Sequence, residues 1–133
     1  MALMLDSDHL IALLRGVQQA HLQYRSVPAD EFLAVSVITA AELYYGVAKS
    51  QDSDGGRRAV REWLDGMVIF LVTDEIAERF GDIKAYLQQR GAIIPDFDIL
   101  IGATTLVHDC TLVTHNTRHF ARIPGLHLVD WLA

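Results

Sequence analysis

Short runs of apolar residues alternate with longer stretches of helical periodicity along most of the chain. The first run ends at Asp6, and comparable runs cover Phe32–Val35, Val68–Val72 and Thr111–Thr114, with a shorter one near His127–Val129. Runs without polar alternation are typical of strands that are buried on both faces of a parallel sheet. These five segments therefore predict a mostly parallel central sheet, although their order within it cannot be read from periodicity.

Helices are predicted between the strands. They cover His9–Arg15 with Gly16 as its stop, Val17–Ser26, Val37–Lys49, Arg57–Asp65 after a polar break at Gln51–Gly56, a long segment from Thr73–Asp74 to Gly91, and a buried segment after Asp98. The helix Val37–Lys49 is apolar nearly all round, so we expect it to be mostly covered. Strands that alternate with helices predict the α/β class, with a three-layer α/β/α sandwich in one domain, residues 1–133.

The composition fits a compact intracellular globule. Hydrophobic residues make up 51% and charged residues 21%, and the one cysteine, Cys110, excludes an internal disulfide. The N-terminus has no basic lead, and its apolar run is too short for a signal peptide or a membrane span. We therefore expect a cytoplasmic protein with no membrane association. The net charge of -6 argues against a broad basic DNA-binding surface, but not against a nuclease that contacts phosphate through metal ions.

Carboxylates stand at the ends or inside three of these predicted elements. Asp6 follows the first strand, Glu42 lies in a helix with almost no other charge, and Asp98 stands at the entrance of the buried helix. If they converge, each close pair repels by about 4 kcal/mol at an effective dielectric of about 20. Such a cluster requires a cation, and all-oxygen ligands favour Mg²⁺ or Mn²⁺. These ions serve phosphoryl transfer by activating water and neutralising charge at phosphate.

Helix capping is the alternative interpretation of each carboxylate. Asp6 and Asp8 are both candidate caps of the first helix, and Asp8 is the stronger candidate. Asp96 and Asp98 are likewise both candidate caps of the buried helix. Glu42 fits a capping box with the threonine three positions before it, although the serine just ahead of that helix is the stronger cap candidate. Only one aspartate of each pair can be the cap, so capping does not explain the presence of the other.

Four bases follow the late strand, at His115, Arg118, His119 and Arg122. A solvated turn explains any one of them about as well as a function does. As a cluster beside a carboxylate site, however, they suit contacts with the phosphate backbone of a nucleic acid.

Four motifs in a fixed order resemble a known family. They are Leu5–Asp8, Ile38–Gly46, Ile94–Ala103 and Leu112–Phe120, the last followed by Ile123–Leu126. Together they resemble the PIN-domain ribonucleases of the VapC toxin family over essentially the whole chain. The resemblance implies a PIN α/β/α sandwich and Mg²⁺-dependent endonucleolytic cleavage of an RNA substrate, which the bases after the late strand would contact. It also implies inhibition by a VapB-type antitoxin.

The resemblance assigns the site residue by residue. It places the metal-binding and catalytic carboxylates at Asp6, Glu42 and Asp98. A fourth catalytic position falls on Asn116, where many members carry an acid, and an asparagine there coordinates through its carbonyl or positions a water without adding charge. His119 also stands where an acid is common.

The resemblance further predicts a homodimer that is normally bound to its antitoxin. The aromatic helix Val37–Val47 supports this expectation, because Tyr44 and Tyr45 suit an interface in which one end of the ring stays wet. An acidic crevice should also attract an arginine or lysine of the inhibitor.

Two other interpretations stay open on the sequence alone. Asp6-Ser7-Asp8 also resembles the nucleophile pair of haloacid-dehalogenase-like phosphatases, but Leu10 replaces the Thr or Val expected there, and the lysine before the late acidic pair is missing. The second is a non-catalytic interaction module of the same fold, supported only by the loss of a carboxylate at Asn116. No aromatic platform or RNA-reading motif identifies the RNA.

Overall fold

A five-stranded parallel sheet forms the centre of the computed structural model, which describes residues 2–133. In chain order the strands are β1 (Leu3–Leu5), β2 (Leu33–Ser36), β3 (Val68–Phe70), β4 (Thr111–Val113) and β5 (His127–Val129). Their spatial order is β3-β2-β1-β4-β5, and each neighbouring pair is parallel, with Met4 opposite Ala34 on one side and Leu112 on the other. The expected parallel sheet is therefore confirmed.

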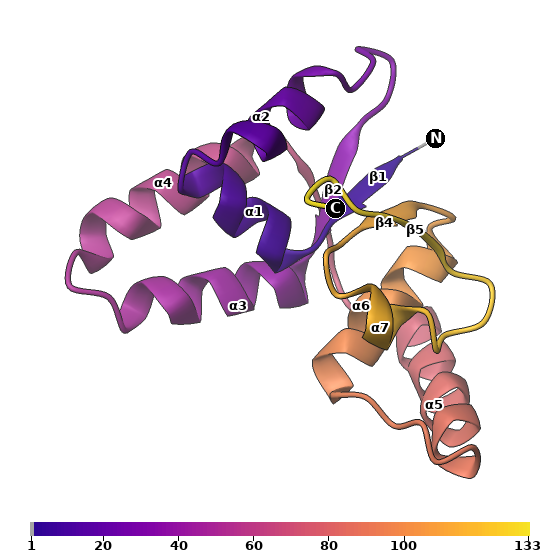
Figure 1. The fold of residues 1–133 in the computed structure, drawn as a ribbon. Helices are drawn as coiled ribbons and strands as arrows, with labels where there is room; N and C mark the ends of the chain where they lie inside the picture. The colour runs from indigo at the N-terminus through magenta and orange to yellow at the C-terminus, as the bar shows by residue number, and fades with distance from the viewer. Residues whose placement is uncertain (1) are drawn as a thin grey trace.

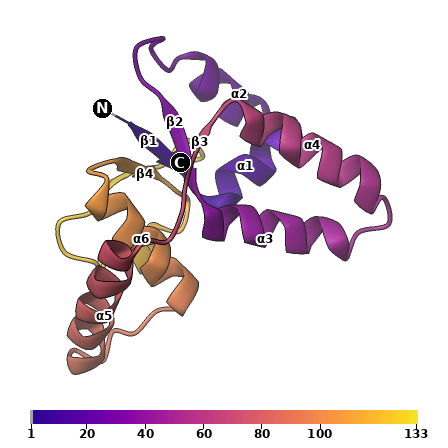
Figure 2. The same cartoon turned by 180° about the vertical axis from the view of Figure 1, so that it is seen from behind.

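Helices cover both faces of this sheet (Figures 1 and 2). One layer contains α1 (Ser7–Leu14), α2 (Gln18–Arg25), α3 (Val37–Ala48) and α4 (Ser53–Asp65); the other contains α5 (Asp74–Gln89), α6 (Asp96–Val107) and α7 (Thr117–Phe120). The three-layer α/β/α sandwich is confirmed. Across residues 2–133, none of the helices combines the length and apolar character that a bilayer span needs.

Two hydrophobic cores explain why the strands lack polar alternation. Met4 and Leu112 pack with Ile76, Ile99 and other residues of the α5–α7 layer. The next residues along the same strands, including Leu5 and Val113, pack against the α1–α4 layer. Successive strand side chains point to opposite faces, so a sheet covered on both faces needs apolar residues at every position.

Side-chain caps fix where several helices begin. Asp6 caps α1, which therefore begins at Ser7 rather than His9, and Asp8 is not the cap. Ser36 caps α3 by accepting from the backbone N–H of Ile38 at 3.0 Å, which confirms the stronger cap candidate and excludes the alternative capping box for Glu42.

Two expected boundaries are also corrected. Helix α4 begins at Ser53 instead of Arg57, because the Asp52 side chain accepts from the backbone N–H of Gly55 at 3.1 Å and starts the helix in spite of its glycines. Strand β3 ends at Phe70, two residues earlier than expected, and Val68 and Ile69 are exposed because β3 is an edge strand.

Helix α3 is mostly covered, as its apolar sequence predicts. Thr39, Ala40 and Leu43 are buried, and Ile38, Tyr44 and Val47 pack against the two cores. The exposed positions of the helix are Ala41, Tyr45 and Ala48, and the Tyr45 side chain is 68% exposed. The expectation is therefore confirmed, with Tyr45 as the large apolar side chain of this helix that stays open to solvent.

Candidate active site

The sheet topology places the candidate site between β1 and β4. After β1 the chain builds β2 and β3 on one side and later returns to build β4 and β5 on the other. In parallel α/β sheets a crevice opens where the strand order reverses, beyond the carboxyl ends of the strands. Asp6 directly follows β1 and Thr114 directly follows β4, so both lie at this crevice.

Asp6 is held rigidly at the end of β1. Its Oδ1 accepts from the backbone N–H of Ser7 at 2.8 Å, and its Oδ2 accepts from the Thr114 hydroxyl at 2.8 Å. Burial, followed by the charge of Asp8, raises the pKa of Asp6 to about 6 in spite of these two hydrogen bonds. Asp6 is therefore both the helix cap and a buried carboxylate beside other acids.

Glu42 reaches the same cluster from the second turn of α3. Burial raises the pKa of Glu42 to about 7, and the next largest causes are the charges of Asp6 and Asp98. Its Oε1 is buried without a hydrogen-bond partner. Because the charge of Asp98 acts on both Asp6 and Glu42, and that of Asp6 on Glu42, the three acids expected from the sequence lie within electrostatic reach of one another.

Asp98 enters from the first turn of α6. Its Oδ2 lies 2.9 Å from Nδ1 of His119 and 3.5 Å from Nδ2 of Asn116. Asn116 and His119 are themselves 2.9 Å apart through the same two nitrogen atoms. Asn116 and His119, where the family often carries acids, therefore both lie beside Asp98. The His119 ring is the hydrogen-bond partner of the Asp98 carboxylate.

The donor set suits a hard divalent cation. The three acids offer only oxygen ligands, and Oε1 of Glu42 is buried without a hydrogen-bond partner. Burial, and after it the charges of neighbouring acids, raises the pKa of Asp6 and of Glu42. As the side chains stand, no group of three or more His, Cys, Asp or Glu within residues 2–133 is close enough to hold an ion. Oδ2 of Asp98 is 2.9 Å from His119, so an ion would compete with this histidine.

Neither aspartate at the start of α6 is its cap. The N-cap position is Pro95, which has no side-chain cap hydrogen bond, and the helix already begins at Asp96. Asp96 instead forms an exposed ion pair with Lys84 of α5, at 3.0 Å between Oδ1 and Nζ. The expectation that one member of the Asp96 and Asp98 pair caps this helix is wrong, because both aspartates lie inside its first turn.

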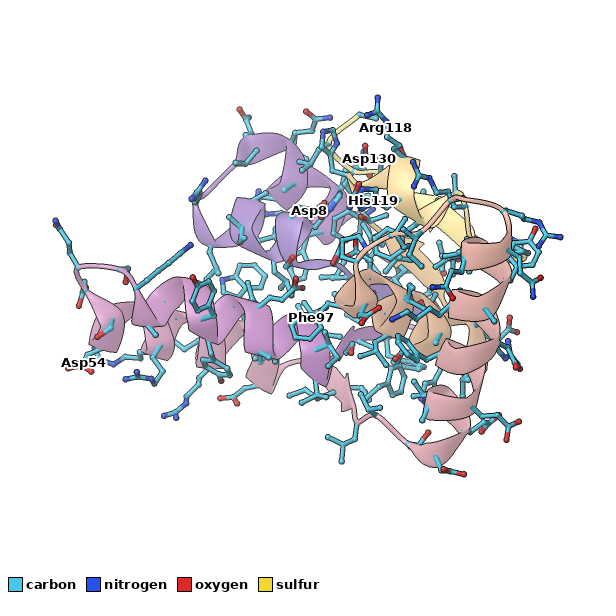
Figure 3. All side chains as sticks on the ribbon, turned by 90° about the horizontal axis from the view of Figure 1, so that it is seen from below. Asp8, Asp54, Phe97, Arg118, His119 and Asp130 are labelled. Carbon is cyan, nitrogen blue, oxygen red and sulfur yellow. The ribbon has the colours of Figure 1, made fainter. Side chains whose placement is uncertain are left out.

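The four bases after β4 have different partners. His119 contacts Asp98, as described, and Arg122 donates to the backbone carbonyls of Ala92 at 3.4 Å and Ile93 at 3.2 Å. His115 pairs with Asp130. Arg118 is exposed and extends from α7 at the surface (Figure 3). The expected cluster is thus divided, and Arg122 has a structural role in tying the segment before α6.

A polar network beside the acids was not anticipated from the sequence. Oδ1 of Asp8 lies 2.7 Å from Nδ1 of the fully buried His9, and Oδ2 accepts from the backbone N–H of His115 at 2.9 Å. Nε2 of His9 accepts from the backbone N–H of Trp131 at 3.0 Å. The network joins the start of α1, the end of β4 and the C-terminal segment, which no local sequence pattern connects.

An apolar groove adjoins the acidic cluster. It has a volume of about 640 Å³ between α1, α3 and α4 and is lined mainly by apolar side chains. Glu42 forms part of its wall, as do Arg15 and Lys49, and Phe97 of α6 also lines it. Figure 3 shows Phe97 between α3 and α6. The groove therefore offers an apolar floor with one carboxylate and two cationic side chains.

Comparisons with known proteins agree with this architecture. The PIN domain family model matches residues 3–126. The chain is 34% identical to Ribonuclease VapC2 of Rickettsia felis over 99 residues, 74% of each chain, and 27% identical to the tRNA(fMet)-specific endonuclease VapC of Salmonella typhimurium over 96% of each.

A solved structure shows the same fold. The crystal structure of VapBC2 from Rickettsia felis, bound to a DNA fragment from the promoter, contains a chain that superposes with a TM-score of 0.92 at 28% identity. The match covers 98% of this chain and 99% of the other. The family match favours the nuclease interpretation of Asp6 over the phosphatase one. With this site, this fold and these relatives, the chain belongs to the PIN domain family and, within it, to the VapC ribonucleases.

Proposed function

We propose that this protein is a metal-dependent endoribonuclease and the toxin of a toxin–antitoxin pair. The observation that carries the proposal is the convergence of Asp6, Glu42 and Asp98, from three separate elements, at the crevice beside β1. The ribonuclease names of the relatives support the reaction class, and the toxin–antitoxin complexes among the structural neighbours support the biological role.

The three carboxylates would hold Mg²⁺ or Mn²⁺. A bound ion of this kind lowers the pKa of its water and neutralises charge that develops at the phosphate. Thr114 and Ser7 fix the orientation of Asp6, and Asn116 lies beside Asp98. Burial is the largest cause of the raised pKa values of Asp6 and Glu42, and repulsion among the acids adds to it. A bound cation would offset that repulsion.

The apolar groove is the proposed binding site of a VapB-type antitoxin. Because Glu42 lies in its wall, a basic side chain of the partner can reach the acidic cluster and pair with it. Arg15 and Lys49 would then face acidic groups of the same segment. Tyr45, which is 68% exposed and lines the groove, would be covered by the partner.

A homodimer belongs to the same proposal. The exposed apolar side chains of β3 and the following loop, Val68, Ile69, Leu71 and Val72, form an edge that a second copy could cover. Light scattering of the purified protein tests this directly. We expect the mass of two chains at micromolar concentration, and a monomer at high concentration would contradict it.

Cleavage of total RNA in Mg²⁺ and in EDTA tests the enzymatic proposal. We expect the wild type to cleave RNA in Mg²⁺ but not in EDTA. The cleavage rate in Mg²⁺ should fall by at least about 100-fold in Asp98→Asn, because a neutral amide replaces a metal-binding carboxylate. Asp96→Asn is the matched control: it makes the same charge change two positions away and should retain activity.

Equal cleavage by the wild type and Asp98→Asn, or cleavage that persists in EDTA, would contradict this mechanism. Sequencing the 5′ ends of the fragments would identify the RNA target. A relative is named as specific for tRNA(fMet), which makes transfer RNA the first substrate to include.

A further inference from the structure

His115 and Asp130 form a carboxylate–histidine pair at the edge of the acidic cluster. Oδ2 of Asp130 lies 2.8 Å from Nδ1 of His115, and Oδ1 accepts from the backbone N–H of Leu132 at 2.8 Å. The Asp130 side chain is only 14% exposed, whereas the His115 side chain is 62% exposed. A largely buried carboxylate thus orients a largely exposed imidazole.

This contact fixes the tautomer of the neutral ring. Burial opposes ionisation of Asp130, but the hydrogen bonds from Leu132 and His115 outweigh it and lower the pKa of this carboxyl. An ionised carboxylate can only accept, so the hydrogen sits on Nδ1 of His115. Nε2, on the ring edge away from Asp130, then carries a lone pair and acts as an acceptor toward solvent.

The pair is close to the proposed catalytic carboxylates. His115 follows Thr114, whose hydroxyl donates to Asp6, and the backbone N–H of His115 donates to Asp8 at 2.9 Å. Figure 3 shows Asp8 and Asp130 on the same part of the molecule as His119, whereas Asp54 lies at the far tip of α4. A nucleic acid strand at the acidic cluster would therefore pass beside His115.

We propose that His115, held by Asp130, accepts a hydrogen bond from a ribose 2′-hydroxyl next to the cleaved phosphate and so helps to select RNA over DNA. Phosphate oxygens are acceptors and offer no hydrogen to this nitrogen, whereas the 2′-hydroxyl is a donor that DNA lacks. His115 is the group that touches the substrate, and Asp130 is a positioning residue. The inference rests on the proposed function in taking RNA as the ligand.

Binding of short RNAs in EDTA tests the inference without cleavage. Fluorescence anisotropy would compare an unmodified RNA with versions that carry one 2′-fluoro or one 2′-O-methyl group at each position in turn. Neither group can donate a hydrogen bond. At one position we expect both to weaken wild-type binding by about three- to tenfold, the effect of one neutral hydrogen bond.

Two variants separate this role from a structural one. His115→Ala, at an exposed position, should remove the loss of affinity caused by the 2′-fluoro group and by the 2′-O-methyl group. Asp130→Asn keeps an oxygen for Leu132 but offers an amide N–H to Nδ1, which moves the ring hydrogen to Nε2. The ring then donates, so the 2′-O-methyl group, whose oxygen accepts, should bind as well as the hydroxyl. Asp54→Asn makes the same charge change on α4 and should retain both wild-type penalties.

Several results would overturn the inference. One is a wild type that binds the modified and unmodified RNAs equally. Another is a penalty that persists in His115→Ala, and a third is an Asp130→Asn profile that matches Asp54→Asn. A loss of affinity in His115→Ala that is equal for every oligonucleotide would mean a phosphate contact instead. Since cleavage is not measured, failure of the nuclease proposal would appear separately, in the Asp98→Asn comparison.

Discussion

Single residues at the end of β1 have two roles at once. Asp6 starts α1 as its cap, and it also carries a pKa raised to about 6 by burial and by neighbouring acids. Thr114 makes this combination tolerable, because its hydroxyl donates to Asp6 at 2.8 Å while its oxygen accepts from the backbone N–H of Asn116 at 3.0 Å. The capping role of Asp6 therefore does not exclude the proposed metal-binding role.

Thr114→Val removes both of these hydrogen bonds at a fully buried position. We expect the free energy of unfolding to fall by about 1–3 kcal/mol, because a buried carboxylate oxygen and a backbone N–H each lose a partner. The pKa of Asp6 should rise further, since the Thr114 hydrogen bond lowers it. Urea unfolding measures the first effect. Thr117→Val, at an exposed position, is the control, and an equal loss of stability in both variants would argue against the account.

Glu42→Gln tests the repulsion among the acids through pH. The folded state raises the pKa of Glu42 from 4.5 to about 7, so folding favours the protonated form. In EDTA the wild type should therefore lose stability as pH rises from about 5 to about 8, and Glu42→Gln should lose less. Unfolding by urea at both pH values checks this. Wild-type stability that rises across this window would refute the prediction.

At the scale of elements, the sequence predicted which helices and strands exist better than it predicted the residues at which they begin and end. Alternating apolar runs and helical periodicity located every strand, and Gly16 ends the first helix with a φ of +74° as expected. The start of α4 was missed because Asp52 caps a segment whose glycines suggested a break. The start of α6 was missed because Pro95, which has no side-chain cap hydrogen bond, occupies the N-cap position. Such choices depend on single local contacts that periodicity does not report.

Close approach between α6 and the segment after α7 depends on Gly102. A Cβ there would lie 2.5 Å from Cδ1 of the buried Ile123. Gly102→Ala should therefore lower stability by about 1–3 kcal/mol, as overpacking does. Gly81→Ala in α5, where a Cβ meets nothing within 4 Å, should raise stability by about 0.5–1 kcal/mol. Thermal unfolding compares the two, and a stabilised Gly102→Ala would show that this contact is loose.

At the scale of the molecule, topology turns distant residues into one site. Asp6, Glu42 and Asp98 could be selected from the sequence because each is an acid in an apolar setting at the predicted start or interior of an element. The pairing of His115 with Asp130 could not, because it depends on β4 and β5 being neighbours and on the C-terminal turn. Strand order, which periodicity does not encode, decides such contacts.

Thermal unfolding in EDTA and in Mg²⁺ tests the central claim, that these three acids form one metal site. An ion that binds only the folded state stabilises it by mass action. We predict that Mg²⁺ raises the melting temperature of the wild type and of Asp96→Asn, but not of Asp98→Asn, which in EDTA should melt at or above the wild-type temperature. The same rise in melting temperature with Mg²⁺ in all three proteins, or no rise in the wild type, would contradict the account.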